Sequence, residues 1–121
     1  MRYMMLYTRD HEDDAPPSPE VMTRMGEFIQ ETAADGTLLA TDGLLPSSFG
    51  ARMDYNDGAF SVTDGPFTET KELVSGFAIV NVDSKEQAID IARRFLDIVR
   101  EGHSEIRLMP DAPAYQRAPA G

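Results

Sequence analysis

The sequence predicts an α+β fold, in which an antiparallel sheet carries two helices on one face and a β-hairpin is inserted into the chain. The apolar patterns follow the order strand, helix, strand, hairpin, strand, helix, strand. This order matches a ferredoxin-like split βαβ plan with one hairpin added. The two best strands are apolar on both faces, but two helices of about four turns each cover only one face. A symmetric copy of the chain is the simplest cover for the second face, so we expect a homodimer.

The first half of the chain supplies a strand and a helix with clear boundaries. Residues 3–8 form the first predicted strand, because apolar side chains occupy successive positions and therefore both faces. Ser18 is expected to cap the first helix, with Pro19 at its first position. An apolar stripe recurs at helical spacing along it: Val21, Met22, Met25, Phe28, Ile29 and Ala33. The Asp35-Gly36 pair should end this helix.

The middle of the chain predicts short strands separated by turns. Residues 37–41 suggest a second strand. Residues 49–54 and 59–63 are the predicted arms of the hairpin. They flank Asn56-Asp57-Gly58, whose residues tolerate the positive φ angles of a tight hairpin turn.

The second half repeats the strand–helix–strand order. Residues 74–82 form the clearest strand, and Ser84 to Gln87 have the form of a capping box that opens a second helix. Its expected buried stripe is Ala88, Ile91, Ala92, Phe95, Ile98 and Val99. Arg100 suits the last turn, Gly102 should end the helix, and residues 105–109 form the last strand.

Composition limits the classes of function. The chain has 121 residues, which we interpret as one domain over 1–110 and a flexible C-terminal tail over 111–121. A formal charge of −10 and a pI near 4.4 argue against nucleic acid and anionic membranes as partners. There is no cysteine, no signal peptide and no apolar run of membrane-spanning length, so a cytoplasmic location is expected. No cofactor is expected either, because phosphate-binding, dinucleotide and zinc motifs are missing from the sequence.

The ten residues 64–73, DGPFTETKEL, are the most distinctive segment. They resemble the signature of the DGPF-type, YCII-related family. The segments RYMMLYT at the start, GTLLATDGLLPSS before the signature and VSGFAIVNV after it carry the same resemblance, which spans most of the chain from Arg2 to Met109. The resemblance implies a dimeric α+β barrel, in which two sheets pack face to face.

The charged side chains of this segment are the candidate site. Pro66 restricts the backbone, so a rigid bend should fix the direction of Phe67 and of the residues that follow. An extended chain would place Phe67, Glu69 and Lys71 on one face. Asp64 or Glu69 would then act as general acid or base, while Phe67 flanks the site and Lys71 holds an anionic substrate group.

Arg52 could extend this site, and the segment also has a purely structural interpretation. Arg52 is a second candidate for holding an anion, and its alternation with Ala51 and Met53 predicts that it points away from the face they bury. The alternative reading is structural. In that reading Asp64 caps the turn, Phe67 fills the core, and the charges form a solvated cluster or an intersubunit ion pair.

The two histidines give no clear site. His11 lies in an acidic loop whose oxygen atoms could take up a divalent cation, but no regular ligand spacing supports a metal, and a solvated loop is the expectation. His103 follows Gly102 and is either a pocket base or a side chain that favours the helix dipole. The family's broader relatives are thought to use a histidine and aspartate pair, with the histidine in the first helix. Residues 18–36 contain no histidine, so no such pair is assigned.

Two functions follow from the resemblance and the residues. One is a small cofactor-independent enzyme that transfers a proton on a polar small-molecule ligand, by analogy with isomerase- and dehydrohalogenase-like proteins of this fold. The other is a non-catalytic binding or regulatory module. The resemblance implies an alternative sigma factor as its partner, because DGPF-type proteins are often encoded beside one.

Overall fold

The computed structural model describes residues 1–12, 15–67 and 73–111. The first half contains β1 (Arg2–Arg9), α1 (Pro19–Ala34), β2 (Leu38–Gly43) and the 3₁₀ helix η1 (Ser47–Phe49). The second half contains β3 (Ala51–Asn56), β4 (Ala59–Asp64), β5 (Leu73–Asn81), α2 (Lys85–Val99) and β6 (His103–Met109). Phe49, predicted to begin a hairpin arm, lies in η1 instead.

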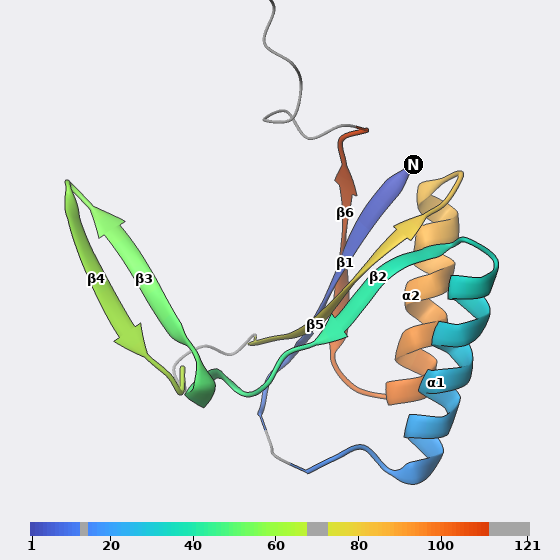
Figure 1. Ribbon diagram of the computed structural model, residues 1–121, viewed down its shortest axis with the longest axis horizontal. Coiled ribbons are helices and arrows are strands. Elements are labelled where there is room, and N and C mark those ends of the chain that lie inside the picture. The colour runs from blue at the N-terminus through green and yellow to red at the C-terminus, as the bar shows by residue number, and fades with distance from the viewer. Residues whose placement is uncertain (13–14, 68–72, 112–121) are drawn as a thin grey trace, which may run out of the picture.

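A four-stranded antiparallel sheet is the centre of the fold. Its strand order is β2-β5-β1-β6, and β3 and β4 form a separate two-stranded sheet. Both helices lie against the same face of the four-stranded sheet (Figure 1). The predicted α+β class, with its ferredoxin-like pattern and inserted hairpin, is confirmed.

Both helices begin at the predicted residues. The Ser18 hydroxyl accepts a hydrogen bond from the Val21 N–H at 3.2 Å, and the Ser84 hydroxyl accepts one from the Gln87 N–H at 3.2 Å. The Gln87 side chain in turn accepts the N–H of Asp83 at 2.9 Å. At the other end of α2 the chain turns at Arg100, whose φ is 62°, so this residue is the cap and lies outside the last helical turn.

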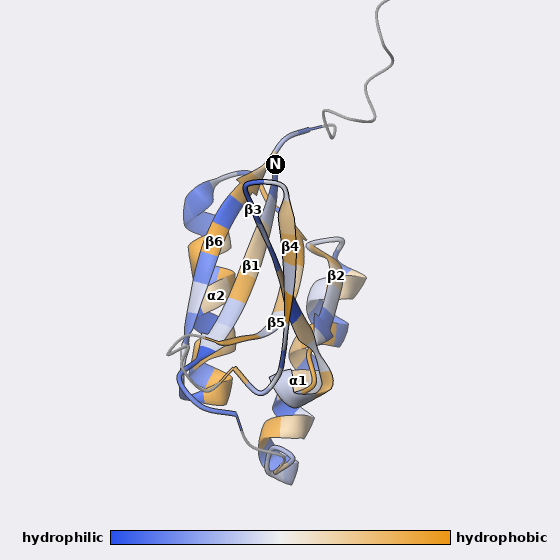
Figure 2. Ribbon diagram, turned by 90° about the vertical axis from the view of Figure 1, so that its left-hand side faces the viewer, coloured by the Kyte–Doolittle hydropathy of each residue, from blue (hydrophilic) through white to orange (hydrophobic). Residues whose placement is uncertain are grey.

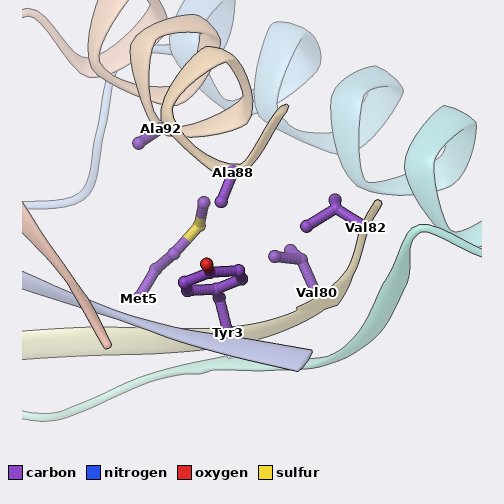
Figure 3. Close-up of a cluster of buried hydrophobic side chains, with 6 residues drawn as sticks. All are labelled: Tyr3, Met5, Val80, Val82, Ala88 and Ala92. Carbon is purple, nitrogen blue, oxygen red and sulfur yellow. The ribbon is translucent and has the colours of Figure 1, made fainter. Parts of the chain in front are cut away.

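The core lies between the sheet and α2. Cross-strand partners Tyr3 and Val80 are both buried on the helix-facing side, and Met5 stands opposite Ala78. Figure 3 shows the side chains of the central cluster meeting between the strands and the helix: Tyr3, Met5, Val80, Val82, Ala88 and Ala92. Within the described residues, neither helix is long and apolar enough to cross a membrane.

The opposite face of the sheet has no helix against it. The register and the two-residue alternation put an apolar group on this open face: Met4, Leu6, Phe77 and Ile79. Figure 1 shows the β3–β4 hairpin standing away from the sheet on this same side. Figure 2 looks onto this side, and hydrophobic stretches are visible along β1 and β4.

The hairpin turn is the predicted one, and the face predicted to be buried is exposed in the single chain. Asp57 and Gly58 have φ angles of 50° and 85°, as the turn requires. Ala51 and Met53 were expected to be buried, yet both are exposed, with 66% of Met53 accessible. The two-residue alternation identified the faces of the hairpin correctly. It could not show what packs against either face.

Candidate functional site

The structure brings two of the predicted site residues together. The Arg52 guanidinium lies over the Phe67 ring, 4.4 Å from its centroid. Asp64 ends β4 opposite Ala51, whereas Arg52 stands opposite Thr63. Successive positions of a strand point to opposite faces, so the Asp64 carboxylate and the Arg52 guanidinium lie on different sides of the hairpin. Glu69 and Lys71, the other two predicted site residues, lie outside the described residues.

The signature turn is held by backbone atoms. The peptide bond between Gly65 and Pro66 is cis. The Gly65 N–H donates to the Gly50 carbonyl at 3.1 Å, and the Phe67 N–H donates to the Ser47 hydroxyl at 2.9 Å. A Cβ atom on Gly65 would overlap the backbone carbonyl of Ser47, so this contact requires glycine. Among the described residues, the Ser47 hydroxyl caps the turn by accepting the Phe67 N–H.

Ser47 also connects this turn to the loop that follows β1. The Glu12 carboxylate accepts the Ser47 N–H and the Ser47 hydroxyl, each at 2.7 Å. Two short bonds to one carboxylate fix the relative position of the two segments. No local sequence pattern indicates this role of Ser47, because its partners lie 20 and 35 positions away.

A polar cluster follows at the end of β1. Glu101 accepts hydrogen bonds from Arg9 and His11, each at 3.2 Å. Hydrogen bonds from Arg9, and then from His11, lower the pKa of the Glu101 carboxyl below its usual value. Arg9 also donates through Nε to the Ser75 hydroxyl at 3.3 Å. His11, expected in a solvated loop, is exposed and hydrogen-bonded to Glu101. The described residues contain no group of three or more side chains that could hold a metal.

His103 is the first residue of β6 and pairs with Thr8 in the sheet. Its Nε2 atom is hydrogen-bonded to the hydroxyl of Thr8, which is buried. The contact ties the start of β6 to β1, next to the polar cluster.

A cavity of about 390 Å³ lies between the helices and the sheet and is partly open to solvent. It lies at the end of the sheet where β1 and β2 end and where β5 and β6 begin. Its wall is mostly apolar and includes Met5, Ala78, Phe28, Ile91, Phe95 and Val99. Arg52, Asp64 and Phe67 do not line it.

Tyr7 is the polar group of most interest in this wall. Its hydroxyl donates to the main-chain carbonyl of Glu101 at 2.9 Å, and its ring packs edge-on against Phe95 with centroids 4.9 Å apart. Burial raises the pKa of the Tyr7 phenol, and the negative charge of Glu101 raises it further. The phenol is therefore neutral at physiological pH and can donate a hydrogen bond.

Two sets of hydrogen bonds, joined by the peptide link between His11 and Glu12, form a chain of contacts from the cavity to the signature turn. From the cavity wall it runs through Tyr7 to Glu101, and from Glu101 to Arg9 and His11. Glu12, the next residue, continues it to Ser47 and the signature turn. Tyr7, Arg9 and Glu101 were not among the site residues predicted from the sequence. The alternation along β1 places Tyr7 and Arg9 on one face, but no local pattern points to Glu101.

Comparison with known proteins identifies the family. Residues 1–110 match the family model of the YCII-related domain. An uncharacterised protein of Rhizobium meliloti (strain 1021) is 31% identical over 97 residues, which cover 77% of this chain and 78% of that protein. The chain belongs to the YCII-related family.

Proposed function

We propose that this protein binds a small molecule with an apolar body in the cavity between its helices and sheet, and transfers a proton on it without a cofactor. The observation that carries the proposal is the apolar cavity with the neutral phenol of Tyr7 in its wall. Ligand cavities of about 300–1,000 Å³ typically combine an apolar lining with a few placed polar groups. The volume of about 390 Å³ falls in that range.

The energetics of packing support a ligand in this space. Protein interiors are close-packed, and unfilled apolar volume costs stability because the lining atoms lose their contacts. Water fits poorly in a space with few polar partners. A small apolar molecule would restore the lost contacts, which makes binding favourable.

The proposed chemistry gives Tyr7 the acid role. Its single O–H hydrogen would move from the main-chain carbonyl of Glu101 to a carbonyl oxygen of the substrate and stabilise the enolate that forms when a base removes a neighbouring proton. Asp64, Arg52 and Phe67 do not line the cavity, and Glu69 and Lys71 lie outside the described residues, so the roles predicted for them from the sequence stay predictions. The alternative of a regulatory module acting with a sigma factor stays a prediction.

Filling the cavity should block binding. Ala78 stands on the cavity floor, so Ala78→Leu should weaken binding of 1-octanol at least about tenfold. It should also stabilise the fold by about 1–2 kcal/mol, because three methylene-sized groups fill apolar space. Chemical-shift titration by NMR measures the affinity, and urea unfolding measures the stability.

A matched control is Ala40→Leu, which adds the same side chain on an exposed residue of β2 outside the cavity. It should leave octanol binding unchanged. If octanol shifts no resonance of the cavity wall, or if Ala78→Leu binds it as well as the wild type, the cavity is not a ligand site.

Proton transfer can be tested separately from binding. In D₂O the wild-type protein should accelerate exchange of the protons next to the carbonyl of 2-octanone, as followed by proton NMR. Tyr7→Phe keeps the ring against Phe95 but removes the hydroxyl, so the acceleration should fall by about 100-fold or more. A wild-type rate equal to that of buffer would contradict the enzymatic part of the proposal for ketones.

We also propose that the protein is a homodimer. The hairpin presents four large apolar side chains on one face, each 59–70% exposed: Met53, Tyr55, Phe60 and Val62. An isolated two-stranded hairpin is only marginally stable in water, so packing against something else would stabilise it. The open sheet face with Met4, Leu6, Phe77 and Ile79 lies on the same side of the molecule, and a second copy would cover both surfaces.

A further inference from the structure

We propose that the cavity takes a carboxylate with an apolar tail, and that Arg9 binds the carboxylate at the cavity mouth. This inference rests on the proposed function of the cavity and names the chemical class of its ligand. Arg9 itself does not line the cavity, but two of its neighbours do. Its Nε donates to Ser75, and it shares Glu101 with Tyr7.

The position of Arg9 is suited to a ligand head group. Arg9 follows Tyr7 by two residues in β1, on the same helix-facing side of the sheet and at its very end. Its side chain is 24% exposed, so the guanidinium is partly desolvated but reachable from outside. A tail lying among Met5, Phe28 and Phe95 would leave its head group near this position.

The guanidinium still has donors to offer. It carries five N–H groups in a planar fork. Nε contacts Ser75 and Nη1 contacts Glu101, whereas no contact of Nη2 with another group is found in the described part of the chain. Nη2 and the second Nη1 hydrogen can therefore meet a carboxylate, for which the fork geometry is well matched.

The local charges favour an anion more than the overall charge suggests. The Glu101 carboxylate is paired with Arg9 and also accepts a hydrogen bond from His11, so its negative charge is partly offset. Asp42 also borders the cavity, but it pairs with Phe77 and its side chain lies on the open face of the sheet. The net charge of −10 repels small anions in general. Binding therefore needs the apolar tail as well as the charge, which selects amphipathic carboxylates over free inorganic anions.

The experiment compares octanoate with 1-octanol, which has the same tail and no charge. Arg9→Met should weaken octanoate binding about tenfold or more and change octanol binding less than twofold, as measured by calorimetry and NMR titration. Arg107→Met is the matched control, because it removes the same charge from an exposed arginine on β6. It should leave both affinities unchanged.

The outcomes separate this inference from the function it rests on. If octanol binds but the octanoate affinity is the same in the wild type and in Arg9→Met, the assignment of Arg9 is overturned. The cavity would still be a binding site. If neither octanol nor octanoate binds, the cavity proposal fails as well.

A measurement on the wild-type protein tests the same inference without relying on the Arg9→Met variant to fold. The pKa of bound octanoate, labelled with ¹³C at its carboxyl carbon, should lie below that of free octanoate if Arg9 contacts it. A raised pKa would show a carboxyl that is desolvated without a cationic partner, and would overturn the inference.

Discussion

Gly65→Ala should lower the free energy of unfolding by at least about 2 kcal/mol, because the added methyl group has no room. Its Cβ would overlap the carbonyl group of Ser47 and approach the Ser48 nitrogen to 3.0 Å. These are backbone atoms, so no side-chain rotation relieves the clash. The turn would have to move away from η1, which breaks the hydrogen bond from Phe67 to Ser47.

Urea unfolding measures this effect, and NMR shows how far it spreads. Because Ser47 is also bound to Glu12, we expect shifts in the loop after β1 and around Glu101. Gly26→Ala is the control, since Gly26 lies within α1 and nothing surrounds its Cβ position within 4 Å. That change should stabilise the protein by about 0.5–1 kcal/mol. A Gly65→Ala protein as stable as the wild type would show that the signature turn does not need its glycine.

Phe60→Asn should convert the proposed dimer into monomers over a wide range of concentration. Burial of a phenylalanine side chain contributes about 1.5–3 kcal/mol, and a two-fold dimer loses it twice. Because each 1.4 kcal/mol changes an equilibrium constant tenfold, the dissociation constant should rise at least about 100-fold. Analytical ultracentrifugation over a dilution series measures it directly.

The control for the dimer introduces the same residue on the other face of the hairpin. Ser61 is next to Phe60 and points the opposite way, so Ser61→Asn should leave the dissociation constant unchanged. Leu6→Asn, on the open sheet face, tests the second surface and should also dissociate the dimer. A wild-type protein that sediments as a monomer at about 100 µM would contradict the homodimer, since stable interfaces of standard size give far tighter association.

Helix boundaries and the hairpin turn were predictable because their causes are local. Ser18 caps a backbone group three residues away, and so does Ser84. The Asp57-Gly58 turn depends only on which residues accept positive φ. Sequence patterns over such short distances correspond directly to contacts, so these elements appear where they were expected.

The site could be predicted only in part, because its contacts join residues that lie far apart in the sequence. The pairing of Arg52 with Phe67 joins two candidates from the sequence, but Asp64 lies on the other face of the hairpin. Ala51 and Met53 are exposed in the single chain, because alternation defines two faces without saying what packs against them.

The sequence by itself determined the order of strands and helices, the family resemblance and the ends of both helices. Only the tertiary structure decided which distant residues meet: Tyr7 and Arg9 reach Glu101 across more than 90 positions, and several elements together enclose the cavity. The physical reason is that a cap or turn is settled by interactions within a few residues. A cavity and its polar mouth depend on how whole layers pack, and no short stretch of sequence records that packing.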